Sequence, residues 1–595
     1  MSYPIETMRH SAAHVTAAAI QRLFPNAKFG IGPAIEFGYY YDIDIGRTLT
    51  LEDLKQIERE MSKIVEENLK FERKEMTIDE AITLFESLNQ PFKVELLKDL
   101  QERGTTAVIG EEAGDIDPNT KGIVSVYTLG TFTDLCRGPH VELASEIGAF
   151  ELQKVAGAFW RGKETNPQLQ RVYGMCFTTQ DELDEYKKML VEAERRDHRR
   201  LGVELDLFSF SPLVGSGLPL WSPKGAILRG VLDDYVWSLR REKGYQKVAI
   251  PHITKKDLYV KSGHWSKYAD QLFVIKTREG HEYALKPMNC PHHTQIFNSK
   301  QRSYRDMPQR YAETTMVYRD EQSGELSGLS RVLCITQDDA HVFCRKTQIE
   351  QECFAIWDII DKFYKTFGFQ LSVRMSVHDP NKFAKYLGTK ETWEMAEAQL
   401  RSMVEKRGVQ YVEGVGEAAI YGPKIDFMGK DAIGRNHQVA TIQLDFIMPM
   451  NLELSCINEA AEKENIVMIH AAIMGSIERF LSVLIEHYAG AFPLWLSPVQ
   501  IAILPVADRH FEAAKLLSDK LTEVGIRVEV DDSAESVGKK IRNAEVKKTP
   551  LIIVFGDKEV ESGNLTVRAR GAAEQKVMST DEFIAEVLER IKSRS

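Results

Sequence analysis

The sequence has few cysteines, no long apolar run and no excess of positive charge, and each absence excludes a class of protein. Its seven cysteines are scattered over 595 residues and odd in number, which argues against a disulfide-stabilised secreted scaffold and indicates a cytoplasmic location. No apolar run is long enough to span a membrane, and the first residues, MSYPIETMRH, lack the pattern of a secretory signal. The net charge of −11 argues against a protein that coats nucleic acid.

The charge is unevenly distributed along a chain whose length predicts about four domains. Residues 500–595 carry 16 Lys and Arg against 17 Asp and Glu, so this segment is near neutral while the rest is acidic. Basic clusters occur within residues 195–200 and 539–548. Such clusters are most often solvated helix faces, although local basic faces can also bind RNA.

The first part of the chain places histidines at helical spacing without the general base of a zinc protease. Apolar residues recur at helical spacing over residues 8–23 and predict an amphipathic helix. His10 and His14 stand at i and i+4, hence on one face of that helix. A zinc protease needs Glu directly after the first histidine, and Ser11 occupies that position.

A second group of candidate ligands lies farther along, in the segment TDLCRGPH. Cys136 and His140 stand on either side of a Gly-Pro pair, which predicts a turn. Together with the two helical histidines they could ligate zinc, since all four are suitable ligand types. From the residues alone, a set of structural histidines and a functional site remain equally open.

Two arginines lie on either side of a short loop in the middle of the chain. Alternating apolar and polar residues predict a half-buried strand that carries Arg319 and Glu321 on one face. The Gly/Ser-rich residues 323–328 predict a loop, and residues 329–336 return as a second strand with Arg331. Two arginines so placed can form a phosphate clamp, because guanidinium groups bind phosphate bidentately. The alternative is a hairpin with a solvated charged face.

Three motifs carry a resemblance to a known family. The stretch AETTMVYRDEQSGELSGLSRVLCITQDDAHVFC resembles motif 2 of the class II aminoacyl-tRNA synthetases, and TQDDAH before a cysteine is similar to the threonyl-tRNA synthetases in particular. A predicted helix over residues 221–241, followed by a strand over 246–250, resembles motif 1, which builds the dimer interface of that family. The segment GSIERFLSVLIEHYAG resembles motif 3, a strand that turns through Gly475 into an apolar-faced helix.

The resemblance covers nearly the whole chain and implies a multidomain α+β and α/β fold. It implies an α+β editing domain over residues 1–179, a charged linker helix over 180–200, a class II catalytic domain on an antiparallel sheet over 201–494, and an α/β anticodon-binding domain over 495–595. Many members carry a ubiquitin-like domain before the editing domain, and we expect this chain to lack it.

Strands and helices alternate in the last segment, which predicts a mostly parallel sheet covered by helices. Strands are expected over residues 500–505, 525–530 and 550–555, and helices over 507–524, 536–546 and 580–593. By the resemblance, Glu559 and Arg568 are expected to contact bases of the anticodon.

The residues alone do not choose the metal ligands among Cys290, His292, His293, His341 and His470. The resemblance implies that Cys290, His341 and His470 bind one zinc ion, whose open position binds substrate. Zinc that binds the amino and hydroxyl groups of threonine rejects valine by ~10⁴-fold or more. Serine lacks only a methyl group, worth about 1–3 kcal/mol, so a second, hydrolytic site is expected.

The resemblance also implies roles for the remaining pocket residues. The threonine pocket is expected to include Asp339 for the hydroxyl group, Tyr421 for the amino group, Gln337 with Arg319 for the carboxylate, and Lys424 and Gln443. ATP with Mg²⁺ is expected to bind Arg319, Glu321, Arg331 and Arg479, the arginines as catalytic groups that stabilise phosphate charge. Two departures from the family pattern are Ile335 in place of a stacking Phe and Ala471 in place of an Arg.

For the editing pocket, the resemblance implies six residues and no assigned metal. They are His10, His14, Lys93, Asp134, Cys136 and His140, expected to position water against the ester carbonyl of mischarged tRNA and to move protons.

Taken together, the sequence predicts a cytoplasmic, homodimeric ligase that activates L-threonine with ATP, transfers it to the 3′ end of tRNA(Thr) and hydrolyses seryl-tRNA(Thr). One alternative is a non-catalytic synthetase relative that binds RNA as a regulator; the three intact arginines argue against it. Another is a metallohydrolase centred on His10 and His14, against which the absent Glu argues.

Overall fold

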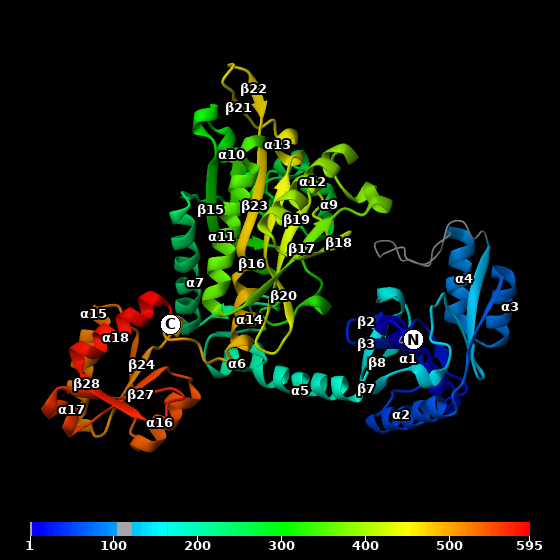
Figure 1. Ribbon diagram of the computed structural model, residues 1–595, viewed down its shortest axis with the longest axis horizontal. Coiled ribbons are helices and arrows are strands. Elements are labelled where there is room, and N and C mark those ends of the chain that lie inside the picture. Colours follow the sequence, from blue (N-terminus) through cyan, green and yellow to red (C-terminus); the bar gives the residue numbers. More distant parts are fainter. Residues whose placement is uncertain (1–2, 104–121, 164) are drawn as a thin grey trace. The chain divides into compact units, whose positions relative to one another are not determined.

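The computed structural model describes residues 3–103, 122–163 and 165–595, and the chain separates into two compact units (Figure 1). The first unit is Met1–Val191 and the second is Glu192–Ser595. Among the helices of the described residues, none combines the length and the apolar composition that crossing a bilayer requires.

The first unit is built around helix α1 (Ile5–Leu23), which is enclosed by an antiparallel sheet and a second helix. The sheet has the order β1-β3-β8-β7, with β2 paired to β3. Its strands are β1 (Lys28–Phe29), β2 (Ala34–Ile35), β3 (Gly38–Asp44), β7 (Ala149–Phe159) and β8 (Gln168–Phe177); the helix is α2 (Leu51–Glu66). Residues 11–20 of α1 are all buried, so the expectation of an amphipathic helix is wrong. The small side chains of its alanines let neighbours cover every face.

A smaller sheet completes the first unit and supplies part of its chemistry. It has the order β4-β5-β6, from β4 (Phe71–Thr77), β5 (Ile123–Leu129) and β6 (Phe132–Leu135), and packs on α3 (Ile78–Ser87) and α4 (Pro91–Arg103). The chain then enters α5 (Gln180–Arg196), in which Leu183 is the one buried residue. This is the charged helix that the sequence predicts.

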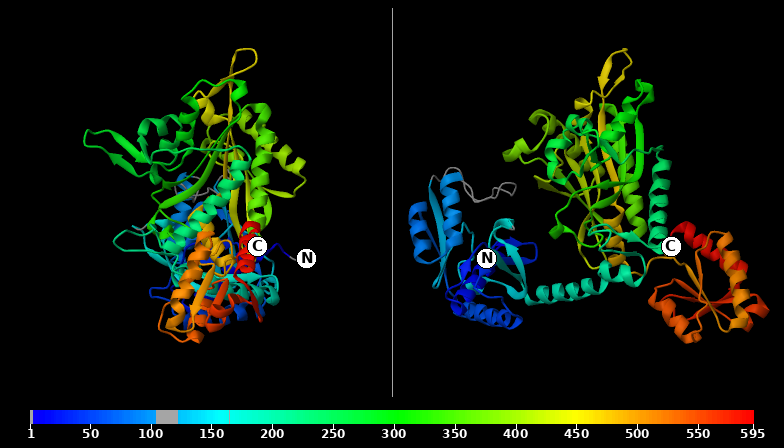
Figure 2. Two further views of the ribbon diagram at one scale, coloured as in Figure 1. Left: turned by 90° about the vertical axis from the view of Figure 1, so that its left-hand side faces the viewer. Right: turned by 180° about the vertical axis from the view of Figure 1, so that it is seen from behind.

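An eight-stranded sheet organises the second unit (Figure 2). Its order is β11-β15-β16-β23-β20-β19-β17-β18, antiparallel except for the parallel outer pairs β11–β15 and β17–β18. Its strands are β11 (Gln246–Lys247), β15 (Gln309–Tyr318), β16 (Cys334–Cys344), β17 (Gln370–Val377), β18 (Tyr411–Val415), β19 (Lys424–Lys430), β20 (Asn436–Asp445) and β23 (Val467–Ser476).

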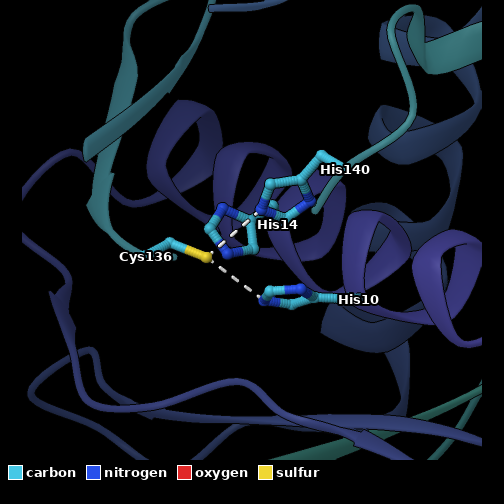
Figure 3. A group of neighbouring side chains, drawn as sticks. All are labelled: His10, His14, Cys136 and His140. Atoms are coloured by element: carbon cyan, nitrogen blue, oxygen red, sulfur yellow. Dashed lines mark hydrogen bonds between the residues drawn. The ribbon is translucent and has the colours of Figure 1, made fainter. Parts of the chain in front are cut away.

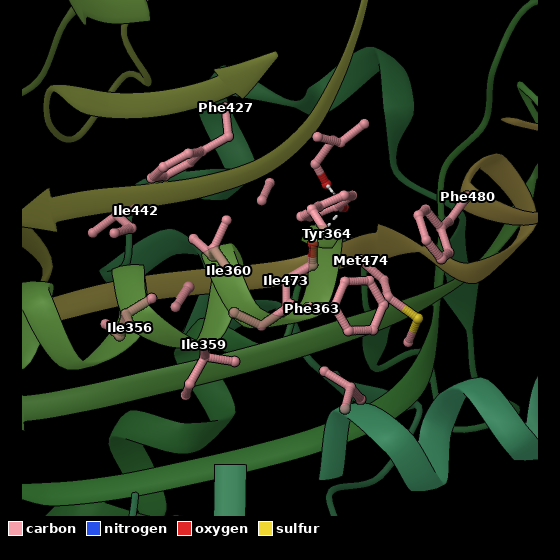
Figure 4. Close-up of a cluster of buried hydrophobic side chains, with 14 of the residues drawn as sticks. Ile356, Ile359, Ile360, Phe363, Tyr364, Phe427, Ile442, Ile473, Met474 and Phe480 are labelled. Atoms are coloured by element: carbon pink, nitrogen blue, oxygen red, sulfur yellow. Dashed lines mark hydrogen bonds between the residues drawn. The ribbon is translucent and has the colours of Figure 1, made fainter. Parts of the chain in front are cut away.

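One face of this sheet is covered by apolar helices, which leaves the opposite face for the site. The helices are α7 (Pro223–Glu242), α11 (Ile349–Phe367) and α14 (Ile477–His487). Figure 4 shows Phe363 and Tyr364 of α11 packed in this core with Phe480 of α14. The Tyr364 hydroxyl lies 2.7 Å from the Ile473 carbonyl and 2.9 Å from the Val439 carbonyl, so its polar end is satisfied.

Smaller elements complete the part of the second unit that surrounds the sheet. They are α6 (His198–Glu204), α8 (Lys256–Lys261), α9 (His264–Lys267), α10 (Cys290–Asn298), α12 (Lys390–Arg407), α13 (Ile447–Asn451), β9 (Phe208–Ser209), β10 (Leu220–Trp221), β12 (Ile253–Lys255), β13 (Val274–Lys276), β14 (Glu282–Leu285), β21 (Ser455–Ile457) and β22 (Lys463–Asn465).

The motif 2 hairpin differs from the sequence expectation in where its second strand begins. β15 ends at Tyr318 and β16 begins at Cys334, so Arg319 and Arg331 lie in the connection and not on the strands. The TQDDAH box lies inside β16. Residues 329–333 are held outside the sheet because the Leu329 side chain is fully buried in the core and the Ser330 hydroxyl donates to Ser482 Oγ at 3.1 Å.

The last segment forms a five-stranded sheet with the order β25-β24-β26-β27-β28. Its elements are β24 (Ile501–Pro505), α15 (Phe511–Glu523), β25 (Val528–Val530), α16 (Val537–Val546), β26 (Leu551–Phe555), α17 (Asp557–Ser562), β27 (Asn564–Ala569), β28 (Gln575–Ser579) and α18 (Thr580–Ser593). The three parallel strands confirm the prediction. The sequence analysis missed α17 and the antiparallel pair β27–β28, whose mostly polar residues give no apolar run.

Candidate functional site

Strand pairing places four of the predicted pocket residues in one row across the large sheet. Lys424 stands opposite Gln443, Gln443 opposite His470, and His470 opposite His341. Directly paired residues on neighbouring strands project from the same face. This pocket row therefore lies on the face opposite the helical core, since the alternate residues of the same strands, such as Val342, Ile469 and Ile442, are buried in that core.

Cys290, His341 and His470 form a buried group, named here the sheet cluster. Cys290 is the first residue of α10, which packs against the sheet, and the three side chains are only 1–5% exposed. Their candidate ligand atoms lie within 4.8 Å of one another. A thiol and two imidazoles are zinc ligand types, and three protein ligands leave a fourth position for another group. The sheet cluster can therefore hold a metal ion.

Each imidazole of the sheet cluster has a partner that orients it. His470 Nε2 lies 2.9 Å from the buried Asp445 carboxylate, which accepts its proton and leaves Nδ1 available to a metal. His341 Nδ1 lies 2.7 Å from His293 Nδ1, which leaves Nε2 available. His293 Nε2 in turn faces Glu313 Oε2 at 3.8 Å. These outer contacts are typical of metal-binding histidines.

The electrostatics of the sheet cluster favour a neutral His341 imidazole and disfavour an unassisted Cys290 thiolate. Burial, aided by the neighbouring imidazoles of His293 and His470, lowers the pKa of His341 well below its ordinary value. Burial raises the pKa of the Cys290 thiol, as do the carboxylates of Asp339 and Asp445. The Cys290 sulfur has only one polar contact among the described side chains, His264 Nε2 at 3.9 Å. A cation would satisfy this sulfur and offset the negative charge around it.

The other predicted pocket residues line the same face. Asp339 accepts from Asn289 Nδ2 at 3.0 Å, and burial raises the pKa of its carboxyl group. The Tyr421 ring stacks on His470 with centroids 4.8 Å apart, and its hydroxyl donates to Gln443 Oε1 at 2.7 Å. These contacts bring a carboxyl group, a phenol and an amide around the sheet cluster.

Two further predicted pocket residues, Lys424 and Gln337, differ in whether their polar groups have partners. Lys424 Nζ pairs with the buried Asp426 carboxylate at 2.8 Å. The side-chain oxygen of Gln337 is buried without a hydrogen-bond partner among the described residues. A buried amide oxygen of this kind is available to a ligand donor.

Because successive side chains of a strand project from opposite faces of a sheet, Asp338 lies outside the site. It neighbours Asp339 in β16 but projects to the other face, where Arg240 Nη1 lies 2.5 Å away. Its carboxylate also accepts the backbone N–H groups of Ile473 and Met474 at 3.0 and 2.9 Å, at an irregularity in the β16–β23 pairing. Asp338 is therefore a structural residue, and Asp339 is the one available to a ligand.

Sequence reasoning assigned no supporting role to the groups that contact the cluster and Asp339, although it considered His293 as a candidate ligand. They are His264, Asn289, His293, Glu313 and Asp445. His293 carried a signal, since it stands three residues after Cys290 on the same helix. The others carried none, because their contacts depend on strand register and helix packing.

The three predicted catalytic arginines have different surroundings. The Arg319 Nε is buried and has no hydrogen-bond partner within the described ranges. Arg331 is exposed and pairs with Glu321 at 2.6 Å and Glu325 at 3.0 Å. Arg479 is exposed near the start of α14, and its guanidinium takes part in none of the ion pairs between described residues. Arg319 and Arg479 are thus available to an anion, and Arg331 would exchange its carboxylate partners for one.

The first unit gathers a second group, His10, His14, Cys136 and His140, named here the pocket cluster (Figure 3). Their candidate ligand atoms also lie within 4.8 Å of one another. Cys136 Sγ lies 3.3 Å from both His10 Nε2 and His140 Nε2, and the Gly138 backbone N–H donates to it at 3.3 Å. The sulfur is therefore surrounded by hydrogen-bonding groups of the protein itself.

Lys93 and Asp134 stand beside the pocket cluster, as the resemblance implies. Asp134 on β6 pairs with Lys93 Nζ of α4 and accepts from the Tyr41 hydroxyl. His14 Nε2 lies 3.5 Å from the same carboxylate. Lys93 and Asp134 are 3% and 2% exposed, so a buried ion pair is aimed at the histidines.

A pocket of about 850 Å³ in the first unit is lined by His10, His14, Lys93, Asp134 and Cys136, together with Arg73 and Arg137. Burial lowers the pKa of His10 and, further, that of His14. Burial also raises the pKa of Cys136 to about 12. At neutral pH the pocket therefore presents neutral imidazoles, which can accept protons, and a neutral thiol.

Ser11, in the position where a zinc protease has Glu, fixes the tautomer of His140. Its hydroxyl donates to the Thr7 carbonyl at 2.8 Å and accepts from the Val141 N–H at 3.0 Å. The remaining lone pair, 3.1 Å from His140 Nδ1, must accept. His140 is therefore protonated on Nδ1 and presents an unprotonated Nε2 to Cys136.

Two predicted anticodon residues are already engaged in local contacts. Both carboxylate oxygens of Glu559 are bonded, one to the Gly556 N–H at 3.0 Å and one to the Thr566 hydroxyl at 2.7 Å. Arg568 pairs with the exposed Glu545 at 2.8 Å. Glu559 thus caps α17, and Arg568 is the more accessible of the two.

Three family models match the chain. Residues 273–488 match the tRNA synthetase class II core domain (G, H, P, S and T), residues 500–590 match an anticodon binding domain, and residues 124–173 match the threonyl and alanyl tRNA synthetase second additional domain. The expected fold class, with a class II core, an anticodon-binding domain and an editing domain, is confirmed.

Individual relatives agree with these matches. A threonine–tRNA ligase of Acetivibrio thermocellus is 44% identical over 589 residues, which cover 99% of this chain and 89% of that protein. One of Dehalococcoides mccartyi is 45% identical over 591 residues, covering 99% and 97%. A crystal structure described as the RNA binding domain of threonyl-tRNA synthetase from Cryptosporidium parvum matches with a TM-score of 0.64 and 37% identity, covering 66% of this chain and 98% of that one. This chain therefore belongs to the threonine–tRNA ligase family of class II aminoacyl-tRNA synthetases.

Proposed function

We propose that this chain activates L-threonine with ATP, transfers it to the 3′ end of tRNA(Thr), and hydrolyses seryl-tRNA(Thr) at a separate site. The observation that carries the proposal is the pocket row, which brings Lys424, Gln443, His470 and His341 to one face of the sheet beside Cys290. A non-catalytic RNA-binding relative would have no use for a threonine pocket assembled to this degree.

The sheet cluster is proposed to hold one zinc ion through Cys290 Sγ, His341 Nε2 and His470 Nδ1. When bound, zinc would supply an open Lewis-acid position for the amino and hydroxyl groups of threonine. The protein orients both imidazoles through His293 and Asp445.

The pocket residues are proposed to hold the rest of the amino acid. Asp339 accepts the hydroxyl proton of threonine, and Tyr421 shapes the pocket beside the amino group. Gln337 and Arg319 bind the carboxylate side, and Lys424 and Gln443 complete the wall. The raised pKa of Asp339, caused by burial, makes its carboxylate a strong acceptor for that hydroxyl.

ATP, as its Mg²⁺ complex, is proposed to bind on the carboxyl side of the bound threonine. The amino-acid carboxylate attacks the α-phosphorus, and pyrophosphate leaves. Arg319 stabilises the charge that builds on the α-phosphate, while Arg331 and Arg479 hold the outer phosphates. Glu321 accepts from the adenine amine, and the ribose hydroxyl at the tRNA 3′ end then attacks the acyl-adenylate.

The pocket of the first unit is proposed to be the editing site. His10 and His14 are neutral, line the pocket and can accept a proton from water, and the Cys136 thiol contacts the rings of His10 and His140. Lys93, held by Asp134, supplies positive charge for the oxyanion that forms on the ester carbonyl. The Ser11 contact keeps the His140 Nε2 unprotonated, so that it can accept from the Cys136 thiol.

The assembly around these sites is also proposed. The editing domain spans residues 1–179, the linker helix 180–200, the catalytic domain 201–494 and the anticodon-binding domain 495–595. Two copies form a homodimer through the motif 1 helix α7, and the enzyme acts in the cytoplasm. Arg568 and Glu559 contact anticodon bases, and Glu559 must release its cap to do so.

The proposal is tested by threonine-dependent exchange of pyrophosphate into ATP, measured without tRNA. Exchange with threonine and not with valine supports the assignment. Exchange that prefers serine or proline would leave the fold standing and overturn the substrate, and no exchange would favour the RNA-binding regulator.

A further inference from the structure

His198, at the start of α6, is buried between the motif 2 connection and the motif 3 helix, two elements that carry the proposed ATP-binding arginines. Its side chain is 5% exposed. It belongs to none of the residues that the family resemblance singles out. Both of its ring nitrogens make contacts within the second unit, and the contacts lie on different elements.

One ring nitrogen holds His198 to the end of α14. His198 Nδ1 lies 2.6 Å from Glu486 Oε1, and the His198 backbone N–H donates to the same oxygen at 3.2 Å. The other oxygen of Glu486 pairs with Arg435 at 2.6 Å. Because the carboxylate is an acceptor, His198 Nδ1 donates its proton to Glu486.

The other ring nitrogen holds the motif 2 connection. His198 Nε2 accepts the backbone N–H of Leu329 at 3.1 Å. The ring lies directly against Gly328, where an added Cβ would approach Nε2 to 2.4 Å. With Nδ1 on Glu486 and Nε2 on Leu329, both nitrogens are used, so the nearby Asp197 and Glu486 do not make this group a metal site.

Leu329, which donates its backbone N–H to His198, lies two residues before Arg331. Leu329 itself is fully buried, and Ser330 Oγ donates to Ser482 Oγ on α14 at 3.1 Å. The backbone N–H of Arg331 is bonded to the Ser327 carbonyl at 3.3 Å. The position from which the exposed Arg331 guanidinium reaches out therefore depends on the core, on α14, and on the contacts that His198 and Arg199 make with Gly328 and Leu329.

We propose that His198 is a positioning residue for ATP, which fixes the base of the motif 2 connection and thereby the reach of Arg331. The inference rests on the proposed function of Arg331. It assigns the last part of the linker, which follows the editing domain, an indirect role in the ATP site. The neutral imidazole is suited to this role because it donates on one side and accepts on the other.

Two substitutions test the two contacts of His198 separately, because the amide groups of Asn and Gln replace different ring nitrogens. In His198→Asn, the amide reaches the Nδ1 position and can donate to Glu486, and the acceptor for Leu329 is lost. In His198→Gln, the amide oxygen reaches the Nε2 position and can accept from Leu329. The matched control is Arg200→Ala, an exposed residue on the same helix.

The measurement is pyrophosphate exchange with the full chain, with KM determined separately for ATP and for threonine. His198→Asn is expected to raise the KM for ATP about 3- to 10-fold and to leave the KM for threonine within about twofold. His198→Gln is expected to restore most of the ATP affinity, and Arg200→Ala to match the wild type. An equal rise of both KM values, or equal values for Asn and Gln, would overturn the proposal.

A second measurement does not depend on the enzyme activity. Trypsin cleavage after Arg331 in the free protein should be faster in His198→Asn than in His198→Gln or the wild type, since the connection is released. If the wild type shows no threonine-dependent exchange, the proposed function fails, and this cleavage still tests the anchor. Unchanged cleavage with an unchanged KM for ATP would remove His198 from the ATP site.

Discussion

The two units each contain a cluster of one cysteine and two or more histidines, and the clusters differ in what satisfies the sulfur. In the sheet cluster, Cys290 Sγ has a single polar contact with the side chains that the structure describes, at 3.9 Å. In the pocket cluster, Cys136 Sγ has two imidazole nitrogens and a backbone N–H at 3.3 Å each. The first sulfur can therefore accept a further ligand, and the second already has three hydrogen-bonding neighbours.

The histidines differ in the same way. Those of the sheet cluster are bonded on their outer sides, to Asp445 and His293, and turn their free nitrogens toward one another. In the pocket cluster, His14 faces Asp134, which also holds Lys93, and the residues line an open pocket. Similar residue types thus suit a metal site in the proposed function of one unit and proton transfer in that of the other, because their hydrogen bonds are committed differently.

The largest expected effects come from truncating each cysteine in turn. Cys290→Ala should remove bound zinc and lower threonine-dependent exchange by at least ~100-fold, while the deacylation of seryl-tRNA stays unchanged. Cys136→Ala should leave exchange unchanged and let seryl-tRNA accumulate. Both activities and the zinc content are measured on both variants. A loss of deacylation in Cys290→Ala would break the comparison.

Removal of the metal should distinguish the two sites by their activities, without any substitution. A chelator is expected to abolish exchange, at least ~100-fold, and added zinc should restore it. Deacylation of seryl-tRNA should survive the same treatment, since the contacts of Cys136 need no ion. Parallel loss of both activities, both regained with zinc, would place a metal in the pocket cluster as well.

The contact between His341 and His293 predicts a smaller effect, which is confined to the affinity for zinc. His293→Ala removes the group that holds His341 Nδ1 and should weaken zinc affinity about 10- to 100-fold. The readout is the rate of zinc release to a chromogenic chelator, with His292→Ala on the same helix as control. Equal rates of zinc release from the two variants would count against a role for His293, and for Glu313 beside it, in holding the zinc ligand His341.

The corresponding outer contact in the first unit is Ser11. Ser11→Ala frees His140 to change tautomer and should slow deacylation about 3- to 10-fold, with exchange unchanged. Ser11→Thr keeps the hydroxyl group and is the matched control. An alanine variant that deacylates at the wild-type rate would show that the tautomer of His140 is set elsewhere.

The last prediction concerns stability as a function of pH, which does not depend on either activity. Burial lowers the pKa of His10, His14 and His140 below the ordinary 6.5, so the folded unit stays unprotonated where the unfolded chain binds protons. Stability is therefore full above pH 6.5 and falls as the pH decreases, by up to about 1.4 kcal/mol per pH unit for each histidine. Pulse proteolysis in urea at pH 7.5 and 5.5 measures this slope, and His140→Gln should reduce it.

Local periodicity accounts for much of what could be predicted from the sequence. The i, i+4 spacing placed His10 and His14 on one face of α1, and the resemblance identified Cys290, His341 and His470 as one group. The positions of Arg319 and Arg331 on strands were wrong, because the burial of Leu329 and the contact of Ser330 hold the chain outside the sheet. No local pattern reports that kind of contact.

The sequence by itself determined the family, the order of the modules and the residue types available at each site, since these depend on motifs and on spacing along single elements. Only the tertiary structure decided what each residue does with its hydrogen bonds. Cys136 meets His10 across 126 residues, and Arg240 meets Asp338 across a helix–sheet interface. The physical reason is that strand register and packing choose the partner of each ring nitrogen and sulfur, and the partner determines the tautomer, the charge and hence the chemistry.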